Sequence, residues 1–106
     1  MPRKKIKRFV TESGRCPFDI WFKKLPKRKR QLVIYSIEKV AQGGSKRNIK
    51  SLKNGLFEIK IKSEGGLRVY FGESANTLIL LLIGGDKSSQ KRDIIQAARL
   101  WSTYDI

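Results

Sequence analysis

Alternating apolar and polar residues predict two strands in the middle of the chain, FEIKIK at 57–62 and LRVYF at 67–71. Because successive side chains of a strand point to opposite faces, each strand has one apolar and one polar face. The segment SEGG at 63–66 predicts a hairpin turn between them. A third strand, TLILLLI at 77–83, is apolar at nearly every position, which is typical of a central strand covered on both faces.

Helical periodicity predicts two helices before these strands and one after them. The first begins at Pro17, the second follows Pro26 and ends before Gly43, and the third begins at Ser88 or Ser89. The apolar residues expected to face the core are, for the three helices in turn, Phe18, Trp21, Phe22 and Leu25; Val33, Ile37, Val40 and Ala41; and Ile94, Ala97, Ala98, Trp101 and Tyr104.

Two weaker patterns complete the expected fold. Residues 5–11 predict a first strand with mixed faces, and the basic segment 45–54 predicts a loop over the sheet. The sequence therefore predicts an α+β fold in the order β-α-α-β-β-β-α. We expect a twisted antiparallel sheet of about four strands, with the helix hairpin on one face and the C-terminal helix closing the other. The length suits one domain over residues 1–106.

The charge of the chain points to a polyanionic partner. There are 24 Lys and Arg against nine Asp and Glu, which gives a net charge of +15. Such a field attracts nucleic acid or an acidic protein, although a basic surface without a partner is the alternative. The sequence shows no secretory leader and no apolar run long enough to span a membrane, so we expect a cytoplasmic protein without membrane contact.

The absence of histidine restricts the chemistry. With one cysteine and no histidine, an internal disulfide is excluded and a zinc site is not expected, so Cys16 is interpreted as a packing residue. Cleavage of RNA by its own 2′-hydroxyl remains open to such a protein. It needs a base at that hydroxyl, positive charge at the phosphate and an acid at the leaving 5′ oxygen, and it needs no metal or other cofactor.

The hairpin predicts where these groups lie. Cross-strand pairing would bring Arg68 opposite Lys60 or Lys62 on the polar face. The planar guanidinium of Arg68 suits the phosphate, and Lys60 is a candidate base because neighbouring cations favour its neutral amine. An ordinary solvated strand face is an equally good interpretation of the two lysines. Tyr70 is a candidate for stacking on a base.

The segment GGDK at 84–87 joins the apolar strand to the last helix. Backbone N–H groups at such a helix start can hold an anion, with Lys87 adding charge. The competing interpretation, which the short motif slightly favours, is a turn in which Asp86 makes local hydrogen bonds. Trp101 and Tyr104 fit the apolar stripe of the helix better than a role in stacking on bases.

Three segments at their spacing resemble the RelE/ParE superfamily of bacterial toxins, and within it the HigB-like branch of phage-associated addiction module killer proteins. They are LKNGLFEIKI at 52–61, LRVYF at 67–71 and LLLIGGDKSSQKRDI at 80–94. The resemblance spans almost the whole chain, and the predicted order of elements is also the order of that family.

The resemblance implies a RelE-like fold and the toxin of a type II toxin–antitoxin system that cuts mRNA on the ribosome without a cofactor. It implies a HigA-like helix-turn-helix antitoxin as partner, contact with mRNA in the ribosomal A site and with 16S rRNA, and contact with operator DNA only through the antitoxin. The catalytic residues carried over are Arg68, Lys60 and Lys87, and RNA contacts are expected at Lys62, Tyr70, Lys50, Lys53 and Lys91.

The resemblance leaves two questions open. Some members place a tyrosine or histidine near the start or the end of the last helix, whereas here Arg92 and Asp93 lie near its start and Tyr104 at its end, so the general base is not identified. The superfamily also contains gyrase inhibitors of the ParE type. A DNA gyrase inhibitor and a non-catalytic basic nucleic-acid-binding protein are therefore the alternatives.

Overall fold

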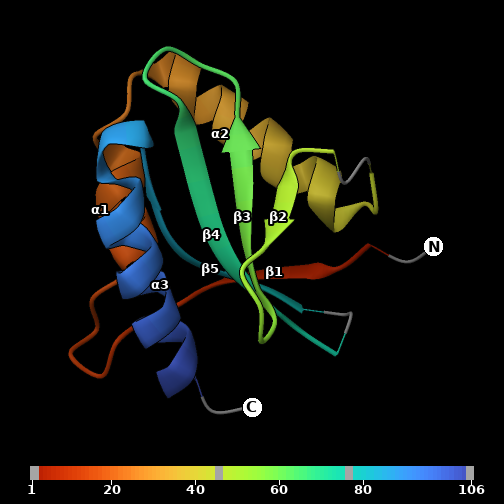
Figure 1. Cartoon of the computed structure of the whole chain (residues 1–106), viewed down its shortest axis with the longest axis vertical. Helices are drawn as coiled ribbons and strands as arrows, with labels where there is room; N and C mark the ends of the chain where they lie inside the picture. Colours follow the sequence, from red (N-terminus) through yellow and green to blue (C-terminus); the bar gives the residue numbers. More distant parts are fainter. Residues whose placement is uncertain (1–2, 45–46, 76–77, 105–106) are drawn as a thin grey trace.

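A computed structural model describes residues 3–44, 47–75 and 78–104, and its elements form a mixed α+β structure (Figure 1). In the described residues, no helix is both long and apolar enough to cross a membrane. The elements are β1 (Lys5–Arg8), α1 (Pro17–Lys23), α2 (Lys27–Ala41), β2 (Ile49–Ser51), β3 (Leu56–Ile61), β4 (Leu67–Ser74), β5 (Leu78–Gly85), the short 3₁₀ helix η1 (Lys87–Ser89) and α3 (Gln90–Thr103).

The five strands form one sheet in the order β1-β5-β4-β3-β2. The pairs β2–β3, β3–β4 and β4–β5 are antiparallel, and β1 pairs with β5 in parallel. The sheet is thus mixed, with one strand more than the sequence predicted. The extra strand is β2, which lies within the segment expected to be a loop and forms by pairing Ile49 with Ile59. Thr77, the expected start of the third predicted strand, lies outside the described residues.

Helices cover both faces of the sheet, as the fully apolar strand β5 required. On one face α1 and α2 pack, while α3 packs on the other (Figure 1). The predicted hairpin of α1 and α2 is therefore confirmed. The strand predicted over residues 5–11 is shorter in the structure, where β1 ends at Arg8; Ile6 contacts one core, and Phe9, just after the strand, is buried in the other. Cys16 packs against the core between the sheet and the α1–α2 pair, as interpreted from the sequence.

The core between the sheet and the α1–α2 pair contains the apolar positions of β3 and β4 that alternation predicted. It is centred on Val33, Val69 and Ile79, which have no exposed surface. The second core, under α3, contains Ala97, with Trp101 and Tyr104 packed against it. Ala98 does not belong to it, because a residue next to Ala97 in a helix is turned away by about 100°, and it is exposed.

Two glycines let the indole rings of the helices reach the sheet. A Cβ at Gly72 would lie 2.2 Å from the ring of Trp101, and one at Gly84 would lie 2.3 Å from the ring of Trp21. Real side chains do not tolerate such distances. These positions therefore explain how α1 and α3 approach opposite faces of the strands that lead to the candidate site.

Candidate functional site

The candidate site lies where the β3–β4 hairpin ends beside the start of α3. The register places Lys60 directly opposite Arg68, and Arg68 opposite Gly85 of β5. The cross-strand pairing of Arg68 with Lys60 predicted from the hairpin is therefore confirmed. Lys60 is exposed, whereas Arg68 is only 5% exposed.

Arg68 is held under the hairpin turn. Its Nη1 donates a hydrogen bond of 2.6 Å to the carbonyl oxygen of Gly66. Its Nε lies 3.9 Å from Oε2 of Glu58, too far for a hydrogen bond, and this buried Nε has no hydrogen-bond partner among the described residues. The guanidinium is thus paired with a carboxylate by charge but retains an unused donor.

Polar side chains from the end of η1 and the start of α3 lie beside this pair. Gln90 donates a hydrogen bond of 3.0 Å from Nε2 to Oε2 of Glu58, which is 4% exposed. Asp93 is 6% exposed and accepts a hydrogen bond of 2.5 Å from the hydroxyl of Ser89. The start of α3 therefore fixes Glu58 above the sheet and brings a second carboxylate to the same region.

Tyr70 belongs to this buried cluster. It has no exposed surface, and its hydroxyl has no hydrogen-bond partner within the part of the chain that the structure describes. Burial raises the pKa of Tyr70 well above its usual range, and the carboxylates of Glu58 and Asp93 raise it further. Contrary to the expectation that Tyr70 stacks on RNA, this structure presents no face of its ring to a ligand.

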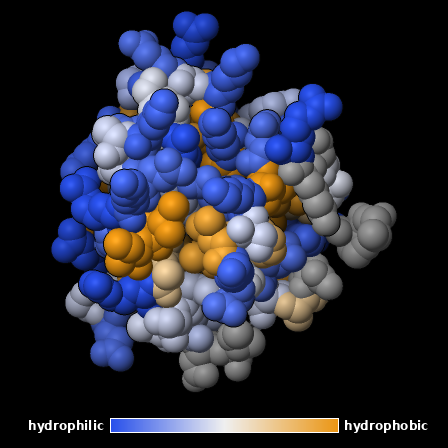
Figure 2. Space-filling model, in the orientation of Figure 1, coloured by the Kyte–Doolittle hydropathy of each residue, from blue (hydrophilic) through white to orange (hydrophobic). Residues whose placement is uncertain are grey.

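The polar face of the hairpin therefore differs from the open cationic face expected from alternation. Since α3 covers it, the positions of Glu58, Arg68 and Tyr70 are buried, and the basic residues that remain accessible lie around the rim. In Figure 2, hydrophilic residues surround a smaller apolar area on the side where α3 lies. The sequence did not predict that Gln90, Ser89 and Asp93 join this cluster, because nothing in the local pattern shows which strand residues a later helix covers.

Lys87 lies next to Arg68. A Cβ at Gly66 would stand 3.0 Å from Nη1 of Arg68 and 3.3 Å from Cβ of Lys87, so both residues border the same small space. The backbone N–H of Lys87 donates a 3.0 Å hydrogen bond to the carbonyl oxygen of Gly65, which ties η1 to the hairpin turn. The three predicted catalytic residues thus gather at one end of the sheet.

Asp86 forms the local turn that the sequence favoured over an anion site. Its carboxylate accepts hydrogen bonds from the hydroxyl and backbone N–H of Ser88 and from the backbone N–H of Ser89. These hydrogen bonds, chiefly the one from the Ser88 hydroxyl, lower the pKa of Asp86. Since the N–H groups at the start of η1 already have an acceptor within the chain, the positive charge of Lys87 is what this segment offers to a ligand.

The remaining predicted RNA-binding lysines are all exposed. Lys50 lies opposite Glu58 in the β2–β3 register, so it belongs to the same face as Lys60. Lys62 follows β3, and Lys91 lies in the first turn of α3, whereas Lys53 lies in the loop before β3. None of them forms an ion pair with another described residue, so their charges face solvent.

Comparison with known proteins identifies relatives of the chain. A family model described as "Phage derived protein Gp49-like" matches residues 20–100. An uncharacterized protein of Haemophilus influenzae is 41% identical over 83 residues, which cover 78% of this chain and 84% of that protein. Because the match includes the end of α1, all of α2, the Arg68 cluster and most of α3, the chain belongs to the family of phage-derived Gp49-like proteins.

Proposed function

We propose that the protein is the toxin of a type II toxin–antitoxin system and that it cleaves mRNA on the ribosome. The chain belongs to the Gp49-like family, which is of RelE-like toxin type, and this membership supports the proposal that the protein is a toxin. The proposed nuclease activity is supported mainly by the positions of Arg68, Lys60 and Lys87, which lie together near the β3–β4 turn in a chain without histidine. The net charge of +15 favours binding to ribosomal and messenger RNA.

The proposed reaction uses the RNA as its own nucleophile. The 2′-hydroxyl gives its proton to the neutral amine of Lys60 and forms a bond to the adjacent phosphorus. The bond from phosphorus to the 5′ oxygen breaks, and Lys87 donates a proton to that oxygen. The products are a 2′,3′-cyclic phosphate and a 5′-hydroxyl, with no net gain or loss of protons.

Arg68 contributes positive charge to the phosphate in this scheme. Because Gly66 carries no side chain, the space beside Nη1 of Arg68 and Cβ of Lys87 stays open on the side of the turn. A phosphate oxygen placed there would meet the end of the guanidinium, while Glu58 holds the other side. Lys62, Lys50, Lys53 and Lys91 would contact flanking phosphates, as solvent-facing lysines suit that role.

We also propose that a helix-turn-helix antitoxin neutralises the toxin and carries it to operator DNA. The reaction would then take place in the cytoplasm. These statements rest on the family and on the charge of the chain.

Cleavage mapping in cells tests the proposal. Wild type, Lys60→Ala and Lys87→Ala would be expressed briefly, with Lys27→Ala as a control that removes an exposed lysine of α2 outside the site. We expect new 5′ ends within translated frames for wild type and the control, and at least about a 100-fold loss for the site variants, which is the lower end of the range for one acid or base. Growth arrest with intact transcripts would indicate gyrase instead, and no arrest would indicate a basic binding protein.

A further inference from the structure

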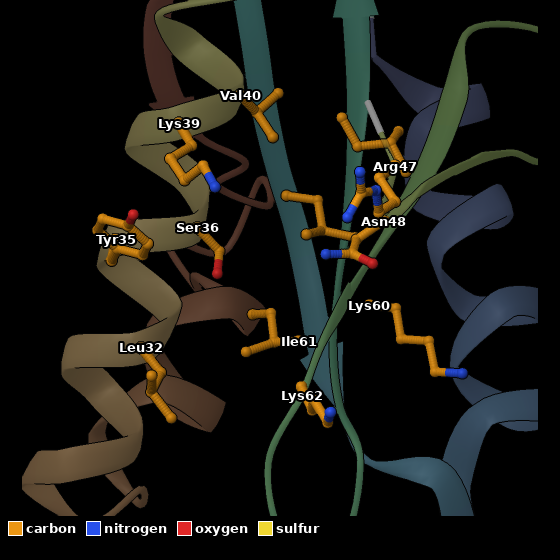
Figure 3. Close-up of a pocket in the computed structure, with 12 residues that line it drawn as sticks. Leu32, Tyr35, Ser36, Lys39, Val40, Arg47, Asn48, Lys60, Ile61 and Lys62 are labelled. Atoms are coloured by element: carbon orange, nitrogen blue, oxygen red, sulfur yellow. The ribbon is translucent and has the colours of Figure 1, made fainter. Parts of the chain in front are cut away.

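A groove separate from the Arg68 cluster runs between α2 and the β2–β3 edge of the sheet (Figure 3). Its volume is about 380 Å³. In Figure 3, Ser36 and Lys39 point from α2 toward the strands, while Arg47 and Asn48 lie on the opposite side. The lining of the groove includes Tyr35, Ser36 and Val40 of α2 and Ile59 and Ile61 of β3.

The groove combines an apolar floor with a basic rim. Val40, Ile59 and Ile61 are buried core residues whose edges form the floor. Among the described residues that line the groove are four cations, Lys39, Arg47, Lys60 and Lys62, and no carboxylate. Lys39 points toward the strands, whereas the side chain of Lys60 points away from α2 (Figure 3). On the α2 side, Nζ of Lys39 stands 5.4 Å from the centre of the Tyr35 ring. A cation over an aromatic face is attracted to it, so Tyr35 holds the Lys39 charge at the mouth of the groove.

We propose that this groove is the docking site for an acidic segment of a protein partner that also carries apolar side chains. Carboxylates of such a segment would meet the basic rim, and its aliphatic side chains would cover the apolar floor. A nucleic acid would match the rim alone, since a sugar-phosphate chain gains little from aliphatic residues. Tyr35 is 63% exposed and offers the segment an additional apolar surface.

The inference does not rest on the proposed nuclease activity. The groove walls contributed by α2 belong to the first core, on the face of the sheet opposite α3 and the Arg68 cluster. Lys60 lines the groove and also pairs with Arg68 across the hairpin. Lys39 and Ser36 therefore allow the groove to be changed without touching the residues assigned to RNA cleavage.

Binding of a labelled short peptide in which glutamate alternates with leucine, measured by fluorescence anisotropy, tests the proposal. The comparison probes are a peptide of the same length with lysine in place of glutamate and a labelled oligouridine. Lys39→Glu reverses a charge on the rim, and Lys27→Glu makes the same change at the exposed start of α2, outside the groove. Ser36→Phe fills the groove without changing the charge.

We expect the glutamate peptide to bind the wild-type protein more weakly as salt is raised. Lys39→Glu should weaken this binding about tenfold, Ser36→Phe should also weaken it, and Lys27→Glu should change it less than about twofold. Oligouridine binding should respond little to Ser36→Phe. The proposal is overturned if the glutamate peptide does not bind, if Lys39→Glu and Lys27→Glu act alike, or if oligouridine loses affinity in parallel with the peptide, which would make the groove an RNA site.

Discussion

Replacing Glu58 with glutamine tests whether the buried carboxylate holds Arg68 in place. Glutamine keeps the shape of the side chain and can still accept the hydrogen bond from Gln90, so the change removes the charge alone. The side chains of Arg68 and Glu58 are 6% and 5% exposed, and Nε and Oε2 are 3.9 Å apart. At an effective dielectric constant of about 20, two unit charges at this distance attract by about 4 kcal/mol.

The measured cost should be smaller than this attraction. Removing the carboxylate also removes the cost of burying it, and Asp93 remains as a second buried acid in the cluster. We therefore expect Glu58→Gln to lower the free energy of unfolding by about 2–3 kcal/mol. A domain of this length has a stability of about 5–15 kcal/mol, so the variant should remain folded. Glu38→Gln, which breaks an exposed pair with Arg3, is the control and should cost less than about 1 kcal/mol.

Urea denaturation of four proteins measures the coupling free energy between Glu58 and Arg68. These are the wild type, Glu58→Gln, Arg68→Met and the double variant. Because each single change leaves the other charge buried without its partner, the double variant should be more stable than the sum of the two losses predicts, by about 1–2 kcal/mol. Additive losses, or a Glu58→Gln cost no larger than that of Glu38→Gln, would refute the argument that this pair is coupled.

Three further predictions follow from single contacts. Gly72→Ala should destabilise the fold by about 1–3 kcal/mol in urea denaturation, because its Cβ would lie 2.2 Å from the ring of Trp101, and unchanged stability would contradict this packing. Asp86→Ala should lower the free energy of unfolding by about 1 kcal/mol near neutral pH, because it removes the cap of η1. The pKa of Asp86 is lowered in the folded protein, so the unfolded chain takes up the proton first as pH falls, and the cost of the substitution should vanish at strongly acidic pH. An equal cost at both pH values would count against the cap. Gly66→Ala should reduce mRNA cleavage by up to about 100-fold, because the new Cβ would close the space beside Arg68 and Lys87. Gly65→Ala controls for backbone strain, since Gly65 has a similar positive φ but no atom within 4 Å of an added Cβ. The Gly65→Ala variant should cleave mRNA much faster than Gly66→Ala.

Much of the fold could be predicted because its strongest signals are local. Alternation identified β3 and β4, and the fully apolar β5 correctly required cover on both faces. The strand β2 could not be predicted in the same way, since three residues with a single apolar side chain carry no pattern, and the strand exists through its pairing with β3. The parallel pairing of β1 with β5 likewise depends on where the helix hairpin returns the chain.

At the candidate site, the sequence predicted which residues pair across the hairpin but not which of them are buried. The hairpin register alone placed Arg68 opposite Lys60. The cover supplied by α3 depends on tertiary packing, and it converts Arg68 and Tyr70 from open surface into a buried cluster. A signal was nevertheless present, because Glu58 interrupts a basic strand and is one of only nine acidic residues in the chain. An isolated carboxylate among cations is a reasonable candidate for a buried ion pair.

The end groups of the cleaved RNA test the central claim most directly. Purified protein would be added to purified ribosomes translating a defined mRNA, and the fragments would be examined for 5′-hydroxyl and 2′,3′-cyclic phosphate ends, with Lys60→Ala as the inactive comparison. The account predicts these two ends for the wild type and intact mRNA for the variant. Fragments with 5′-phosphate ends, or equal cleavage by both proteins, would contradict attack by the 2′-hydroxyl at this site.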